Sequence, residues 1–200
     1  MNQFLAVAAV TAFVLTGCER SGPSSSESQH EGGNSVTEFR APDSADSDGA
    51  STERLEPQSA EQLREWIASH RGSPMLVNYW ATWCDPCVAE MPDFLAVAEE
   101  FASDGLVCLI VAMDPMVYGY PKDRMATDVP KFLVERGWDL PCRLFDGEAK
   151  PARIVEVLGV AGALPTTVLI DRDGERVEVH RGRATREEFR AFAEQVLEIR

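Results

Sequence analysis

Hydrophobic and polar positions follow a regular pattern only after about residue 57. Residues 74–80 (PMLVNYW) and 105–114 (GLVCLIVAMD) are apolar on both faces, which is typical of buried strands in a parallel sheet. Apolar residues that recur every three or four positions predict helices with one buried face. These predicted helices cover residues 59–72, 86–102, 129–137, 151–158 and 185–197.

Shorter apolar segments predict the rest of the sheet. Residues 142–145 (CRLF) predict a short strand, and residues 166–171 and 175–181 predict a hairpin around the turn RDG. Strands alternate with helices, and the chain then closes with a hairpin and a last helix. The predicted fold class is therefore α/β, with a mixed central sheet flanked by helices.

Two predicted helices begin with the spacing of a capping box. Ser59 is followed by Gln62, and Thr185 by Glu188, so each pair satisfies two backbone donors at a helix start. Both helices are therefore expected to begin at these residues.

The N-terminus carries a targeting pattern. Residues 4–15 are an apolar run too short to span a bilayer comfortably, and residues 15–18 read LTGC. This pattern resembles the bacterial lipoprotein signal, which implies a signal peptide at 1–17 and lipidation of Cys18. The alternatives are an ordinary secretory signal or an uncleaved anchor. In each case the rest of the chain is expected outside the cytoplasm, in the periplasm or cell envelope.

Residues 18–56 are rich in Ser, Gly, Pro and acidic residues and contain few apolar side chains. Such a segment cannot bury enough surface to offset its ordering entropy, so it is predicted to be a disordered acidic tether. The folded domain is expected at residues 57–200. The net charge is −14, and the sequence contains no basic stripe that could bind phosphates, so no nucleic-acid partner is expected.

Cys84 and Cys87 are the strongest chemical signal in the chain. A structural disulfide would close a loop so small that it removes little entropy from the unfolded chain. A zinc site needs further ligands, and no second pair of this spacing is present. Because the pair follows a buried strand and opens a helix, the helix dipole favours a thiolate at Cys84. A redox-active pair is the favoured interpretation.

The motif NYWATWCDPC at 78–87, with ALPTTVLIDRDG at 163–174, resembles the thioredoxin fold, and most closely its membrane-tethered TlpA/ResA-type thiol–disulfide oxidoreductases. The resemblance covers about residues 57–200 and implies a thioredoxin-like three-layer sandwich. It also implies that Cys84 attacks, that Cys87 resolves, and that Pro165 is a cis-proline facing them. The preceding backbone, at Leu164, would then bind an extended substrate. The alternative for Pro165 is an ordinary trans turn.

A proton acceptor for Cys87 is also expected. Cytoplasmic thioredoxins carry a buried Asp at the position of Asn78, and here that acid is missing. Glu90 lies three residues after Cys87 on the same helical face and resembles the acidic residue of the TlpA/ResA group. A partly buried carboxylate there can take the proton from Cys87. The alternative is a solvated glutamate.

The neighbours of the pair carry smaller expectations. Trp83 and Pro86 match the family pattern WCxPC, so Trp83 is expected to shield the site and Pro86 to fix the first helical turn. Asp85 adds negative charge, which favours the disulfide and makes the dithiol more reducing. The remaining Cys108 and Cys142 are expected in strands, with a second disulfide between them as an alternative.

The predicted function is an extracytoplasmic thiol–disulfide oxidoreductase that reduces client proteins such as apocytochromes c. Its expected partners are client disulfides, a membrane-borne thiol reductant as electron donor, and the membrane through the lipid anchor. No cofactor and no metal are expected. The alternatives are a thioredoxin-fold peroxidase, a copper-binding module and a non-catalytic scaffold.

Overall fold

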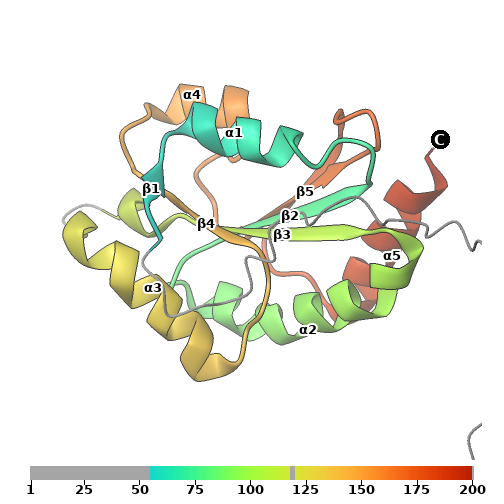
Figure 1. Ribbon diagram of the computed structural model, residues 1–200, viewed down its shortest axis with the longest axis horizontal. Coiled ribbons are helices and arrows are strands. Elements are labelled where there is room, and N and C mark those ends of the chain that lie inside the picture. Colours follow the sequence, from blue (N-terminus) through green and yellow to red (C-terminus); the bar gives the residue numbers. More distant parts are fainter. Residues whose placement is uncertain (1–54, 118–119, 200) are drawn as a thin grey trace, which may run out of the picture. The chain divides into compact units, whose positions relative to one another are not determined.

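The computed structural model describes residues 55–117 and 120–199, which form a six-stranded sheet with helices on both faces (Figure 1). The strand order is β1-β4-β3-β2-β5-β6. The strands are β1 (Pro57–Gln58), β2 (Met75–Trp80), β3 (Val107–Ala112), β4 (Cys142–Phe145), β5 (Thr166–Ile170) and β6 (Arg176–Arg181). Strands β1 to β4 pair in parallel, while β5 pairs antiparallel with both β2 and β6, so the sheet is mixed as predicted.

The helices divide between the two faces of the sheet. Figure 1 shows α1 and α4 on one face and α2, α3 and α5 on the other, which gives three layers. The helices are α1 (Ala60–Ala68), α2 (Asp85–Phe101), α3 (Lys122–Arg136), α4 (Pro151–Leu158) and α5 (Arg186–Glu198). Two short 3₁₀ turns, η1 (Ala102–Asp104) and η2 (Asp114–Met116), flank β3.

The alternation of side chains along β2 divides the core in two. Leu76 and Trp80 belong to the hydrophobic cluster under α2, α3 and α5, whereas Met75 and Tyr79 belong to the cluster under α1 and α4. Asn78 shares the alternation of Leu76 and Trp80, so it lies on the α2 side of the sheet. All six residues of β2 are buried, which explains why the strand reads as a continuous apolar run.

The strand register brings three loops to one edge of the sheet. Trp80 ends β2 opposite Ala112, the last residue of β3, and Tyr79 pairs with Thr166, the first residue of β5. The loop that leads from β2 to Cys84, the turn after β3 and the loop before β5 are therefore neighbours.

The predicted elements are confirmed except at three places. Strand β1 was not predicted, because two residues carry no periodic pattern. Helix α3 begins at Lys122 instead of residue 129, because the charged segment before Met125 hides its first turns and Pro130 resembles a first-turn proline. Helix α1 ends at Ala68 before the expected Gly72.

The predicted signal peptide, Cys18 and nearly all of the predicted tether lie outside the described residues. At the start of the described part, the Leu55 backbone N–H donates to Ala126 O at 3.2 Å, and the Leu55 side chain packs against the core. Within residues 55–117 and 120–199, none of the helices has the length and apolar character needed to cross a bilayer.

Candidate active site

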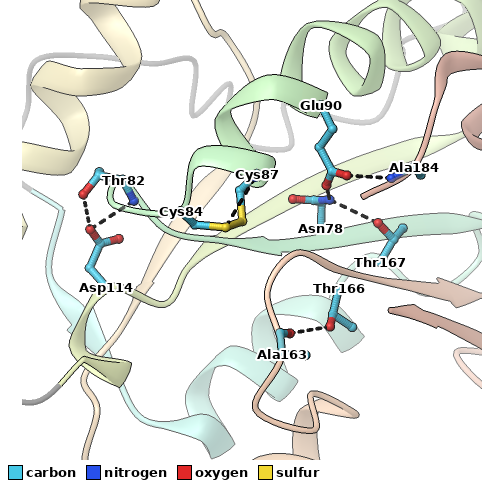
Figure 2. The surroundings of a disulfide bond; sticks show 10 residues. All are labelled: Asn78, Thr82, Cys84, Cys87, Glu90, Asp114, Ala163, Thr166, Thr167 and Ala184. Carbon is cyan, nitrogen blue, oxygen red and sulfur yellow. Dashed lines mark hydrogen bonds between the residues drawn. A yellow bond between two sulfur atoms is a disulfide. The ribbon is translucent and has the colours of Figure 1, made fainter. Parts of the chain in front are cut away.

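Cys84 and Cys87 form a disulfide at the start of α2 (Figure 2). Their Cα atoms lie 5.3 Å apart. Cys84 is the N-cap of the helix, and its Sγ accepts a hydrogen bond from the Cys87 backbone N–H at 3.3 Å. Cys84 is 5% exposed and Cys87 is fully buried, so an attacking partner can reach the pair only through Cys84. Position at a helix N-terminus favours negative charge on that sulfur once the pair is reduced.

Glu90 is buried beside the pair. Its side chain is 1% exposed, so the alternative of a solvated glutamate is wrong. One carboxylate oxygen accepts a hydrogen bond from Asn78 Nδ2 and the other from the Ala184 backbone N–H, both at 2.8 Å. Burial raises the pKa of Glu90 to about 7, although the two hydrogen bonds and the nearby charge of Arg183 oppose the shift. A carboxyl group with this pKa can exchange a proton near neutral pH.

Asn78 joins Glu90 to the sheet. Its side-chain nitrogen also donates to Thr167 Oγ1 at 3.1 Å, and both residues are buried. Asn78 therefore links β2, β5 and α2 on the face that carries the cysteine pair. Figure 2 shows its carboxamide oxygen on the side toward the disulfide and its nitrogen toward Glu90 and Thr167.

The Leu164–Pro165 peptide bond is cis, as the resemblance implied, and the alternative of a trans turn is wrong. Pro165 is buried directly before β5 and follows the half-buried Leu164. The Gly182 backbone N–H donates to Pro165 O at 2.9 Å, so the corner after β6 fixes this loop. Since Thr166 pairs with Tyr79, Pro165 lies at the sheet edge from which the Cys84 loop departs.

Trp83 and Pro86 border the pair on the outside. Trp83 is 43% exposed, yet its indole N–H is fixed by a hydrogen bond to the Asp114 main-chain oxygen at 3.1 Å. Pro86 is exposed in the first turn of α2, at a position where a helix has no use for a backbone N–H. Both residues therefore present fixed surface beside Cys84.

Asp114 and the Ala184 backbone contribute to the site and were not predicted. Asp114 is fully buried and accepts hydrogen bonds from the Thr82 hydroxyl and backbone N–H. The Ala184 backbone N–H, which donates to Glu90, has no side-chain signal in the sequence. For Asp114 a signal existed, because this acidic residue comes two positions after the end of a buried strand whose carboxyl end meets the Cys84 loop.

Cys108 and Cys142 are free and buried, so the alternative of a second disulfide is wrong. Burial raises the pKa of each thiol to about 12, which leaves both protonated and unreactive. Across residues 55–117 and 120–199, His, Cys, Asp and Glu side chains nowhere gather in threes as metal ligands would.

The chain is similar to known proteins. Residues 39–178 match the AhpC/TSA family. The chain is 30% identical over 126 residues to thiol-disulfide oxidoreductase ResA of Bacillus thuringiensis (strain Al Hakam), covering 63% of this chain and 65% of that protein. ResA of Halalkalibacterium halodurans is 31% identical over 143 residues, covering 71% of this chain and 70% of that protein.

Among solved structures, a thiol:disulfide interchange protein of the thioredoxin family from Chlorobium tepidum TLS superimposes with a TM-score of 0.51 at 27% identity. The match covers 65% of this chain and 83% of that protein. The thioredoxin-like fold predicted from the sequence is thereby confirmed.

Proposed function

We propose that this chain, which belongs to the AhpC/TSA family, is an extracytoplasmic thiol–disulfide oxidoreductase that reduces the disulfides of particular client proteins. The observation that carries the proposal is the Cys84–Cys87 disulfide at the N-terminus of α2, with the buried Glu90 carboxyl beside it. The names of the ResA relatives support the reaction class.

In the reduced protein, the Cys84 thiolate attacks one sulfur of a client disulfide. A mixed disulfide forms between Cys84 and the client, and the other client sulfur leaves as a thiolate. Glu90 then takes the proton from the Cys87 thiol, and the Cys87 thiolate attacks Cys84 Sγ. The second client thiolate leaves, two electrons have passed to the client, and the protein has the disulfide of Figure 2.

Charge around the pair supports electron flow toward the client. Strong periplasmic oxidants stabilise their thiolate partly through a histidine between the cysteines, whereas here Asp85 and Pro86 occupy those positions. The negative charge of Asp85 disfavours the thiolate. It therefore makes the reduction potential more negative by tens of millivolts, so that the dithiol is a stronger reductant. We expect a potential of roughly −220 to −290 mV, close to that of thioredoxin.

This direction requires a source of electrons. A reducing dithiol in an oxidising compartment becomes oxidised unless a donor reduces it again. We propose a membrane-borne thiol reductant as that donor and a Cys18 lipid anchor that keeps the domain near it. Apocytochromes c, whose haem-binding cysteines must be reduced, are the proposed clients.

Equilibration of the purified domain against glutathione or dithiothreitol mixtures tests the direction. A potential above about −170 mV would make the protein an oxidant and overturn the assignment. A Cys87→Ala variant tests the clients, because its mixed disulfides through Cys84 cannot be resolved and can be identified by mass spectrometry. The matched control is Cys84→Ala, which retains Cys87 and should trap nothing.

A further inference from the structure

Asp114 is a second carboxyl group buried beside the cysteine pair, and the exchange reaction neither adds nor removes its proton. It is 0% exposed, compared with 1% for Glu90. Figure 2 shows the two acids on opposite sides of the disulfide, with Asp114 on the Cys84 side and Glu90 on the Cys87 side. Asp114 is the first residue of η2 and is separated from the end of β3 only by Met113, so the central sheet fixes its position.

Asp114 binds both residues that precede Cys84. Its Oδ1 accepts hydrogen bonds from the Thr82 backbone N–H at 3.2 Å and from the Thr82 hydroxyl, and its main-chain oxygen accepts the Trp83 indole N–H at 3.1 Å. The Met113 backbone N–H also donates to Trp80 O at 2.7 Å. The chain between the end of β2 and Cys84 is therefore held to the end of β3 at Trp80, Thr82 and Trp83.

The charge of Asp114 acts on the site separately from its hydrogen bonds. Burial raises the pKa of its carboxyl, while the hydrogen bonds from Thr82 and Tyr120 lower it. A neutral amide would accept the Thr82 hydrogen bonds at a smaller desolvation cost. What an ionised carboxyl group adds to the loop anchor, compared with an amide, is a negative charge on the Cys84 side of the disulfide.

We propose that Asp114 is a positioning residue for Cys84. Asp114 holds the loop from Ala81 to Cys84 against β3, and its charge disfavours the Cys84 thiolate. The proposal rests on the exchange reaction proposed above and names a residue that tunes it. Loss of the charge should stabilise the reduced protein, and loss of the hydrogen bonds should slow the attack by Cys84 without a comparable change in the equilibrium.

Asp114→Asn tests the charge, because asparagine retains an oxygen that accepts from Thr82. Against a glutathione buffer, we expect the equilibrium constant to move toward the dithiol by about tenfold, which corresponds to about 30 mV. Alkylation of Cys84 by iodoacetamide should also shift to lower pH. The matched control is Asp104→Asn, which removes an exposed carboxylate just before β3, at the opposite end of the strand.

Thr82→Val and Thr82→Ser test the hydrogen bonds, since only serine retains the hydroxyl donor. We expect Thr82→Val to slow the attack of Cys84 on a small aromatic disulfide by about tenfold, and Thr82→Ser to react like wild type. Circular dichroism establishes that each variant is folded.

A glutathione equilibrium of Asp114→Asn equal to that of wild type and of Asp104→Asn would overturn the electrostatic role. Equal rates for Thr82→Val and Thr82→Ser would overturn the positioning role, and this pair also decides the matter if Asp114→Asn does not fold. A wild-type pair that fails to exchange with glutathione would instead overturn the proposed function itself.

Discussion

The surroundings of Glu90 suit its proposed role as the proton acceptor for Cys87. Its carboxyl is held by two hydrogen-bond donors, yet burial keeps its pKa at about 7, so both protonation states are populated near neutral pH. A fully stabilised carboxylate would be too weak a base for a thiol. The balance between donors and burial is what gives this residue its proposed role.

Substitution of Glu90 by Gln should slow reduction of a small disulfide substrate by roughly 10²-fold, because the Cys87 proton loses its acceptor. Stopped-flow kinetics of the second step, the attack of Cys87 on the mixed disulfide, measure the effect directly. The matched control is Glu99→Gln, which changes an exposed glutamate on the same helix. An unchanged rate together with unchanged titration of Cys87 would leave Glu90 a structural residue.

The same residue should make stability depend on pH. Its pKa is 4.5 in a solvated chain and about 7 in the fold, so between these values the folded protein binds more protons than the unfolded chain. The free energy of unfolding should therefore fall as pH rises from 4.5 to 7, by on the order of 3 kcal/mol. Urea unfolding of the oxidised protein at several pH values measures this slope.

Glu90→Gln should flatten that part of the profile, whatever its effect on stability at a single pH. A variant whose profile parallels that of wild type between pH 4.5 and 7 would show that other groups cause the dependence.

At the scale of the elements, the sequence predicted what is encoded locally. The buried strands β2 and β3, the amphipathic helices α1 and α5 and both capping boxes were recognisable, because each depends on residues close together in the chain. The contacts of Asp114 and of Ala184 join residues 32 and 94 positions apart, and only the folded sheet brings them together. Glu90 was found because it lies on the helix that carries the cysteines.

The two capping boxes allow a test of whether the start of α5 influences Glu90, with the start of α1 as the control. Thr185→Ala and Ser59→Ala each remove a side chain that accepts a backbone N–H at a helix start, so each should cost about 1 kcal/mol of unfolding free energy. Thr185 follows Ala184, whose N–H donates to Glu90, whereas α1 lies on the other face of the sheet.

Only Thr185→Ala should therefore change the pH dependence of disulfide reduction. Thermal unfolding and pH–rate profiles of both variants measure the two effects. Identical pH–rate profiles for both variants would show that the corner before α5 does not influence Glu90.

At the scale of the whole molecule, the proposed function makes redox chemistry and location depend on each other. The described domain carries a complete cysteine site, yet a reducing dithiol outside the cytoplasm is useful only near its electron donor. The LTGC pattern offers a physical solution, because a lipidated N-terminus followed by an acidic segment would hold the domain at the membrane surface. Anchoring and redox state should therefore change together.

Cys18→Ala should abolish lipid anchoring and leave the cysteine pair oxidised. Without the thiol, no lipid can be attached, so metabolic labelling with a lipid precursor should mark wild type and not the variant. Cys84→Ala is the control, since it retains Cys18 and should be labelled normally.

Separated from a membrane-borne donor, the Cys18→Ala domain should accumulate with Cys84 and Cys87 oxidised, which alkylation followed by gel-shift analysis measures in cells. Equal labelling of wild type and Cys18→Ala would refute lipidation, and an unlabelled variant that stays reduced would show that its donor is not confined to the membrane.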